Sequence, residues 1–357
     1  MIRVLVVDDL PSACMAIQAV LEADAQIRVI GQAHRGVDAV RMAADLKPDL
    51  VTMDIHMPGG MDGFEATQAI MDTCPTSVVM VTTSFSRESG LLSRSLKVGA
   101  VDVLKKPIVY AWRRDPVAAR SFVRNIKILA RVKRGELRQG TWRLAPSNES
   151  PGSRFQDQAS AECRVVAIAC STGGPGALCT VLGGLPSDFP AAVLIVQHMA
   201  EGFIEGLARS IDERCVLNVR VAHPGVSVEP GVALFAPDHV HMTVNGRRRI
   251  CLQSAPRIRW FRPAADLLLS SVADVYGPRS IGVILTGMLD DGARGIQQIH
   301  DHGGWTIAQE AVTCVVPSMP NAAMALGGVD RVLPLEDIAP ELVRRVMRNA
   351  ECVVRMA

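Results

Sequence analysis

The chain has 357 residues, more than one typical hydrophobic core serves, so we expect two domains. Hydrophobic residues make up 48% of the sequence and charged residues 21%, the balance of a globular protein. A net charge of +2 argues against a protein built as a whole to bind nucleic acid, so any basic function must be local.

Cysteine usage and the N-terminal segment bear on the cellular compartment. The nine cysteines include no C-x-x-C pair, and such an odd, unpatterned set indicates reduced thiols in a cytoplasmic protein rather than a disulfide framework. The opening MIRVLVVDDL has one basic residue followed by two acids, so we expect no signal peptide. No uncharged apolar run reaches about 18 residues, so we expect no insertion into a membrane.

The first part of the chain alternates short apolar runs with helical segments such as Ala13–Glu22 and Val37–Leu46. The apolar runs are Val4–Val7, Ile27–Ile30, Leu50–Met53, Ser77–Val81 and Val101–Leu104. Short strands separated by helices predict a parallel sheet that is covered on both faces. We therefore expect a doubly wound α/β domain over residues 1–133.

A basic stretch closes this first domain. Between Lys105 and Arg143 the sequence has twelve lysines and arginines against two acids. Phe122, Ile126 and Leu129 have the i, i+4, i+7 spacing of one helix face. The stretch is interpreted as the last amphipathic helix of the domain with a solvated basic face. The alternative is a docking surface for an acidic partner.

A linker and a second α/β domain follow. Residues 134–162 include the Ser-, Pro- and Gly-rich segment Ala145–Ser160, which predicts a flexible linker. Apolar runs then recur at Val165–Ala169, Ala192–Val196, Val232–Phe235, Ser280–Leu285 and Trp305–Ala308. They predict a Rossmann-like, mostly parallel α/β domain over residues 163–357.

Polar residues end successive strands of the first domain. Asp8 and Asp9 end the first strand, Asp54 the third and Thr82 the fourth, and Lys106 follows the fifth. The carboxyl ends of parallel strands meet at one edge of a sheet, where three carboxylates repel each other unless a cation lies among them. Hard oxygen ligands suit Mg²⁺. The set predicts a phosphoryl site with Asp54 as nucleophile and with the metal and Lys106 neutralising the phosphoryl charge.

The motifs VVDD, MDIHMP…MDG, the strand-four threonine and KP resemble the response-regulator receiver family. The resemblance implies a flavodoxin-like fold and phosphate transfer from a histidine kinase to Asp54. It also assigns the magnesium ligands Asp8, Asp9 and Asp54 with the backbone carbonyl of His56, and the switch residues Thr82 and Lys106. Two features depart from the family: an extra glycine lengthens the Gly59-Gly60 loop, and the last helix is expected to start late.

The second domain opens on VVAIACSTGGPGAL, in which the apolar run that starts at Val165 ends in a glycine turn before a helix. Such turns hold phosphates or a nucleophile. This one has neither the Lys-Ser/Thr pair of a Walker loop nor the third glycine of the dinucleotide fingerprint. It is interpreted as a nucleophile turn, with Ser171 at the start of a helix near Pro175. Cys170 precedes the turn and is expected to be packed.

A serine nucleophile needs a base and an acid. His198 ends the next apolar run, and VGVILTGMLDDG places Asp290 and Asp291 after a later one. These strand ends offer Ser, His and Asp for a hydrolytic triad, in which Ser171 attacks a carbonyl and the histidine carries the proton. Two backbone N–H groups are expected to bind the oxyanion, those of Thr172 and Met288.

Longer motifs, among them ACSTGGPGAL, IVQHMAEGF, GVILTGMLDDGARG and MPNAAMALGGVD, resemble the catalytic domain of chemotaxis protein-glutamate methylesterases. The resemblance assigns Ser171, His198 and Asp291 as the triad. It implies hydrolysis of γ-glutamyl methyl esters on chemoreceptors through an acyl-serine, a parallel glutamine amidase activity and no organic cofactor. It also implies that the unphosphorylated receiver covers the active-site edge until Asp54 is phosphorylated. Trp260 and Phe261 depart from the polar or basic residues usual before RP.

Three alternatives stay open. A non-catalytic response regulator, whose output domain only binds a protein partner, needs no triad. A DNA-binding regulator would use the Lys105–Arg143 stretch, but no recognition-helix pattern follows it. His239 and His241 have an i, i+2 spacing that suits a metal on a strand, but no cysteine or acid pattern joins them.

Overall fold

The computed structural model of the chain describes residues 1–83, 94–95, 97–106, 116–131 and 164–354. The chain divides into two compact units, Met1–Trp142 and Arg143–Ala357. The predicted linker 134–162 lies outside the described residues, so the domain boundaries at 133 and 163 stay predictions. None of the described helices combines the length and apolar character that crossing a lipid bilayer requires.

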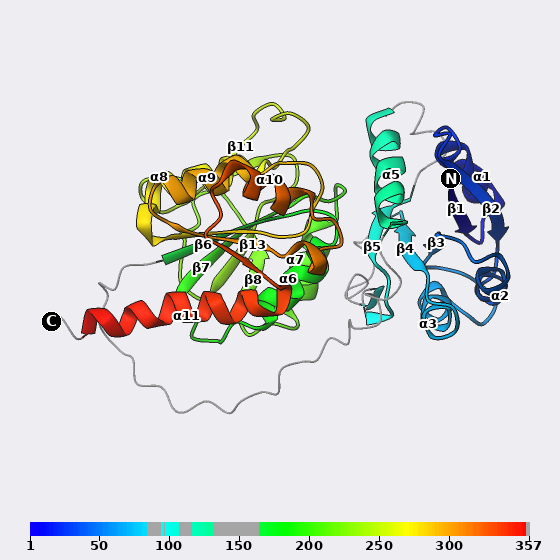
Figure 1. The fold of residues 1–357 in the computed structure, drawn as a ribbon, viewed down its shortest axis with the longest axis horizontal. Helices are drawn as coiled ribbons and strands as arrows, with labels where there is room; N and C mark the ends of the chain where they lie inside the picture. The colour runs from blue at the N-terminus through cyan, green and yellow to red at the C-terminus, as the bar shows by residue number, and fades with distance from the viewer. Residues whose placement is uncertain (84–93, 96, 107–115, 132–163, 355–357) are drawn as a thin grey trace. The chain divides into compact units, whose positions relative to one another are not determined.

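The first unit is built on a parallel five-stranded sheet with the strand order β2-β1-β3-β4-β5 (Figure 1). Its strands are β1 (Ile2–Val7), β2 (Ile27–Ala33), β3 (Leu50–Asp54), β4 (Ser77–Thr82) and β5 (Asp102–Lys105). Its helices are α1 (Pro11–Leu21), α2 (Gly36–Leu46), α3 (Gly63–Thr73) and α5 (Pro116–Leu129). This strand order is the flavodoxin-like one, which confirms the predicted fold class.

Burial explains why these strands read as unbroken apolar runs. Every residue of β3 and β4 is buried, because helices pack on both faces of a doubly wound sheet. The helix α3 begins with a capping box, in which the Asp62 carboxylate accepts from the Glu65 N–H and the Glu65 carboxylate accepts from the Asp62 N–H. The helix α5 is described over Pro116–Leu129, and its expected late start stays a prediction because residues 107–115 lie outside the described part of the chain.

The second unit contains a parallel seven-stranded sheet with the order β14-β13-β12-β6-β7-β9-β8. Its strands are β6 (Arg164–Cys170), β7 (Ala191–Gln197), β8 (Asn218–Val221), β9 (Val232–Phe235), β12 (Ser280–Ile284), β13 (Trp305–Gln309) and β14 (Arg331–Leu333). A separate antiparallel pair is formed by β10 (His241–Val244) and β11 (Ile250–Gln253). The Rossmann-like prediction is confirmed, although β8, β10, β11 and β14 were not among the predicted runs.

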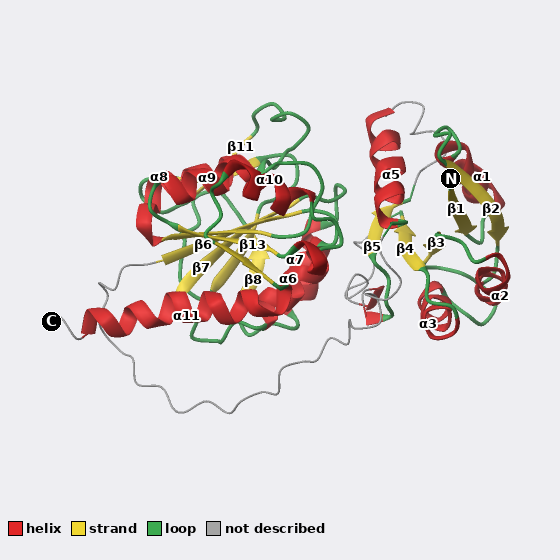
Figure 2. Ribbon diagram, in the orientation of Figure 1, coloured by secondary structure: helices red, strands yellow, loops and turns green. Residues whose placement is uncertain are grey.

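Helices cover both faces of this sheet (Figure 2). One face carries α8 (Ala265–Tyr276), α9 (Ala293–Asp301) and α10 (Ser318–Leu326). The other carries α6 (Gly174–Gly183), α7 (Ile204–Asp212) and α11 (Leu335–Val354). The strands β12, β6 and β7 are direct neighbours at the centre, so the chain segments that leave their carboxyl ends lie at one edge. Ser171, His198 and the Asp290-Asp291 pair all follow these three strands.

Candidate functional site

The carboxyl edge of the first sheet brings the predicted phosphoryl-site residues together. Asp8 is fully buried after β1, and Asp54 is buried at the end of β3. One carboxylate oxygen from each of Asp8, Asp9 and Asp54 lies within 4.8 Å of the others. His56, which follows β3, lines a pocket of about 380 Å³ together with Asp9. The edge therefore combines oxygen donors at a spacing that suits one divalent cation.

Lys106 holds two of these acids. Its Nζ lies 2.6 Å from Oδ2 of Asp8 and 3.0 Å from Oδ2 of Asp54. The other Asp54 oxygen accepts a hydrogen bond of 2.9 Å from the Ile55 N–H. The register of β4 and β5 sets Thr82 opposite Lys105, one residue before Lys106, so the buried Thr82 belongs to the same edge.

Burial and charge shift the pKa values of this cluster. Burial raises the pKa of Asp8 and of Asp54 above the usual aspartate range, although Lys106 acts in the opposite direction. Burial alone would lower the pKa of Lys106, but its hydrogen bonds and charge interactions with the two carboxylates outweigh that effect and raise it. Three acids against one lysine leave an excess of negative charge at a buried edge. The donor set therefore fits a hard cation such as Mg²⁺.

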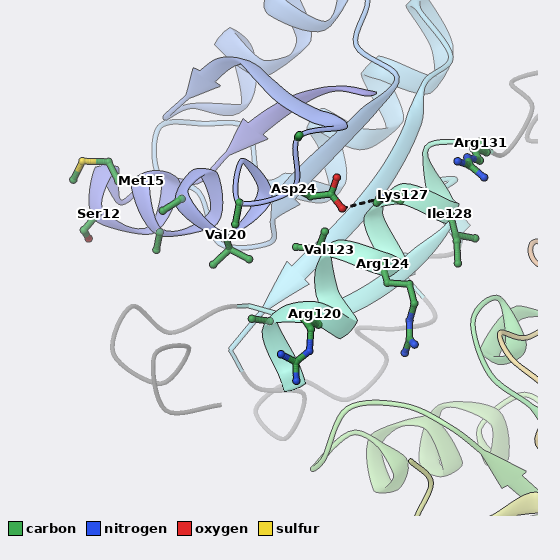
Figure 3. Close-up of a pocket in the computed structure, with 15 residues that line it drawn as sticks. Ser12, Met15, Val20, Asp24, Arg120, Val123, Arg124, Lys127, Ile128 and Arg131 are labelled. Carbon is green, nitrogen blue, oxygen red and sulfur yellow. Dashed lines mark hydrogen bonds and ion pairs between the residues drawn. The ribbon is translucent and has the colours of Figure 1, made fainter. Parts of the chain in front are cut away.

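The basic helix α5 packs on α1 in the same unit. Phe122, Ile126 and Leu129 are buried, as their spacing predicts. On the outer side, α1 and α5 enclose a groove of about 1140 Å³, shown in Figure 3. Its charged lining residues are Asp24, Arg120, Arg124, Lys127 and Arg131, and apart from Ser12 the other lining side chains are apolar. Docking of an acidic partner on this surface stays a prediction.

In the second unit the backbone of Ser171 is fixed by neighbours from three strands. Its N–H donates to the Thr286 carbonyl (3.0 Å), and its carbonyl accepts from the Gly174 N–H (2.8 Å). The same carbonyl accepts from Nε2 of Gln197 (2.8 Å), which also donates to the His198 carbonyl (2.8 Å). The helix α6 starts at Gly174, directly after the turn, as predicted. Ser171 thus lies at a rigid junction of β6, β7 and β12.

His198 lies between Asp291 and an aromatic ring. Its Nε2 lies 2.9 Å from Oδ2 of Asp291. Its Nδ1 is buried and, among the described residues, makes neither a hydrogen bond nor the Asp291 contact that Nε2 makes. The Phe261 ring stacks on the imidazole with 4.3 Å between the ring centroids and 22° between the planes. The histidine is therefore oriented by an acid at its edge and by a ring on its face.

Asp291 is held at the start of α8. Its Oδ2 accepts from the Ala265 N–H (2.7 Å) and its Oδ1 from the Asp266 N–H (3.0 Å). Burial alone would raise the pKa of Asp291, but His198 and these two N–H donors together lower it below the usual range. Asp290 instead pairs with the Arg259 guanidinium at the surface. The structure thus brings Asp291, and not Asp290, to His198.

The two predicted oxyanion donors follow Ser171 and Gly287, and a Cβ added to Gly287 would lie 3.0 Å from the Ser171 nitrogen. Thr172 is buried, and its carbonyl accepts from Oγ1 of Thr286 (3.0 Å). Met288 is buried next to Leu289, which has a left-handed backbone (φ 69°). Within the described part of the chain, neither the Thr172 N–H nor the Met288 N–H donates to another protein group. Both donors are therefore available to a ligand.

Several residues that support this site were not singled out from the sequence. The Gln197 amide joins the Ser171 and His198 carbonyls, and Gln309 accepts from the Thr286 N–H (2.8 Å) through Oε1. Asp266 stabilises the turn after Asp291, because its Oδ1 accepts a hydrogen bond from the Gly292 N–H (2.9 Å). The sequence pattern that could have identified the two glutamines is a polar residue at the buried end of an apolar run, as in VLIVQH and WTIAQ.

His239 and His241, the alternative zinc pair, make contacts with different groups. Nε2 of His241 lies 3.0 Å from the Pro256 carbonyl, and its Nδ1 accepts from the Ala264 N–H (3.1 Å). Nε2 of His239 lies 2.7 Å from a Glu201 carboxylate oxygen at the surface. No grouping of three potential metal ligands in the described residues includes either histidine. Both rings are accounted for by other contacts.

Replacing Gly287 with alanine is expected to lower the melting temperature. A Cβ there would lie 2.8 Å from Cβ of Ser171 and 2.1 Å from Sδ of Met319, so the turn must shift. Overpacking of this kind costs about 1–3 kcal/mol, which corresponds to a drop of roughly 3–10 °C in a domain of this size. Calorimetry of the variant and of wild type measures the melting temperatures. Gly246→Ala is the control, because no atom lies within 4 Å of its added Cβ. An equal drop in melting temperature for this control would contradict crowding at Gly287 as the cause.

Comparisons with known proteins match both units. Residues 166–342 match the family model for the CheB methylesterase, and residues 4–111 match that for the response regulator receiver domain. A protein-glutamate methylesterase/protein-glutamine glutaminase of Symbiobacterium thermophilum is 41% identical over 355 residues, with 97% of each chain covered. One of the same name from Pyrococcus horikoshii is 36% identical over 349 residues, covering 97% of this chain and 94% of its own.

A solved structure matches the second unit. The crystal structure of the Thermotoga maritima CheB methylesterase catalytic domain has 38% sequence identity to this chain and a TM-score of 0.51. The match covers 52% of this chain and 100% of that domain.

Proposed function

The chain belongs to the CheB methylesterase family of hydrolases and carries a receiver domain ahead of its catalytic domain, and from that premise we propose that it hydrolyses γ-glutamyl methyl esters on chemoreceptors under the control of phosphorylation at Asp54. The observation that carries the proposal is the His198–Asp291 contact of 2.9 Å, together with the Gln197 amide that binds the backbone carbonyls of Ser171 and His198. Three adjacent strand ends supply a nucleophile, a base and an orienting acid, as acyl transfer requires.

The proposed reaction runs through an acyl-serine. Oγ of Ser171 attacks the ester carbonyl while Nδ1 of His198 takes the hydroxyl proton. The Thr172 and Met288 N–H groups stabilise the oxyanion of the tetrahedral intermediate. The histidine then returns the proton to the leaving methoxide, and methanol departs. Water attacks the acyl-serine by the same proton route, which yields the glutamate carboxylate and restores Ser171.

Asp291 serves this cycle by remaining ionised. Its lowered pKa and its two backbone donors keep a negative charge next to Nε2 of His198, which stabilises the imidazolium that forms during attack. The same groups would release ammonia from a glutamine amide, because an amide nitrogen also leaves after protonation. A glutaminase activity on receptor glutamines is therefore part of the proposal.

The phosphoryl site in the receiver is proposed to control the hydrolysis. A histidine kinase is the proposed phosphodonor and Asp54 the acceptor. Mg²⁺ would be held by the carboxylates of Asp8, Asp9 and Asp54 with the His56 carbonyl, and it would supply charge neutralisation for the phosphoryl oxygens. Lys106, 3.0 Å from Asp54, adds a second positive charge, and Thr82 offers a hydroxyl at the same edge.

The test of the esterase is methanol release from a chemoreceptor cytoplasmic fragment that carries labelled methyl esters. The full-length chain is expected to release labelled methanol and to leave glutamate side chains on the fragment. If the fragment keeps its label under conditions in which the chain is folded, the esterase proposal is wrong. The non-catalytic output domain then becomes the better account.

Removing divalent cations is expected to abolish phosphoryl uptake by the receiver. Without a cation, the three carboxylates repel the incoming phosphoryl group, and Lys106 alone does not balance them. The measurement is incorporation of label from a small-molecule phosphodonor with a chelator and then with added Mg²⁺. Methanol release by the unphosphorylated chain is the internal control and should not respond to the chelator. Full incorporation in the chelated sample would refute the proposed metal site.

A further inference from the structure

A short hairpin beside the candidate triad is not explained by the chemistry described so far. It spans Arg257–Arg262, between β11 and α8. Ile258 and Phe261 form an isolated antiparallel bridge, with N–H to carbonyl distances of 3.1 Å and 3.0 Å in the two directions. Arg259 at its turn has a left-handed backbone (φ 54°), which a residue with a side chain rarely adopts. Such a conformation persists only where surrounding contacts hold it.

Two contacts hold the hairpin against the active-site edge. The Phe261 ring stacks on the His198 imidazole, 4.3 Å between centroids. The Arg259 guanidinium pairs with the carboxylate of Asp290, the residue before Asp291. One contact is thus made to the proposed base and the other to the chain that carries the orienting acid. The tip of the hairpin has a fixed place next to the reacting groups.

The tip presents an unusual surface to solvent. Trp260 is 67% exposed and Ile258 is 37% exposed, and Arg257 next to them is also exposed. By contrast Trp305, also described in this domain, is covered by the Arg345 guanidinium at 3.3 Å from the ring centroid. An exposed tryptophan on a rigid element beside arginine is the composition of a protein-binding hot spot.

We propose that the Arg257–Arg262 hairpin is the docking element for the protein substrate, with the Trp260 indole as its apolar anchor. The partner that fits it is an acidic peptide surface flanking the esterified glutamate. The hairpin has three arginines, and Asp290 is the described acid that pairs with one of them. Arg257 donates to the Trp260 backbone carbonyl (3.3 Å), which ties this guanidinium to the tip of the hairpin. The inference rests on the proposed esterase function.

The test compares two substrates for the Trp260→Ala variant of the full-length chain. On the methylated chemoreceptor fragment, kcat/KM is expected to fall by about 10- to 30-fold, mainly through KM. On p-nitrophenyl acetate, which has no peptide surface, the rate should stay within about twofold, because the triad is intact. Val216→Ala is the control, since this side chain is also exposed (66%) but lies outside the hairpin. It should match wild type on both substrates.

The affinity for the receptor fragment tests the docking proposal independently of turnover. In the Ser171→Ala background, adding Trp260→Ala is expected to raise the Kd for the methylated fragment by about tenfold or more. Arg257→Glu should also raise it. Trp260→Phe should restore part of the affinity. An unchanged Kd, or an equal loss of rate on both substrates, would overturn the docking proposal. Hydrolysis of neither substrate by wild type, with the Kd shift present, would instead refute the esterase proposal and leave docking standing.

Discussion

Replacing Ser171 with alanine is expected to lower methanol release by about 10⁴-fold or more, because the change removes the oxygen that is proposed to attack the ester carbonyl. The turn should survive the change. The contacts that fix it are made by the Ser171 backbone, whose N–H donates to Thr286 and whose carbonyl accepts from Gly174 and Gln197. The variant should therefore keep the wild-type melting temperature and still bind the receptor fragment. The rate is measured as labelled methanol per mole of chain.

Cys170 provides the matched control for this prediction. Its thiol directly precedes Ser171 in the chain, but it is fully buried at the end of β6, with Sγ 3.8 Å from the Val196 carbonyl. Burial raises the pKa of its thiol well above the ordinary range, so little thiolate forms. Cys170→Ala should keep most of the activity. If Cys170→Ala loses methanol release and Ser171→Ala retains it, the nucleophile is the Cys170 thiol and the proposal is wrong.

Replacing Asp54 with alanine is expected to reduce phosphoryl incorporation from a small-molecule donor to background. Asp54 sits where Lys106 and the carboxylates of Asp8 and Asp9 converge, and its Oδ1 also accepts from the Ile55 N–H. Asp72→Ala is the control, because its carboxylate is exposed on α3, where it accepts a hydrogen bond from the Gln68 amide. The measurement is stoichiometry of acid-labile phosphate with Mg²⁺ present. Unchanged incorporation in the Asp54 variant would place the acceptor elsewhere.

The fold and the approximate location of both sites follow from one regularity of the sequence. Each apolar run that ends in a polar residue proved to be a parallel strand, and parallel strands share a carboxyl edge. Ser171 and His198 follow β6 and β7, which pair directly, so their proximity needs no further information. Asp8, Asp54 and Lys106 follow from the same argument in the receiver.

Other parts of the sites depend on contacts that periodicity does not encode. The orientation of Asp291 rather than Asp290 toward His198 depends on the left-handed turn at Leu289 and on two N–H donors of α8. The stacking of Phe261 on His198 joins segments far apart in the sequence. The strands β8 and β11 were missed because they are short and only partly buried, which leaves no continuous apolar run.

The measurement that tests the central claim most directly is methanol release from the methylated chemoreceptor fragment with and without a phosphodonor, for wild type and Asp54→Ala. The account predicts that the phosphodonor accelerates release by wild type, and that Asp54→Ala retains a basal rate that the phosphodonor does not change. If wild type incorporates phosphate from the donor and yet releases methanol at the same rate with and without it, control of the esterase by the receiver is contradicted.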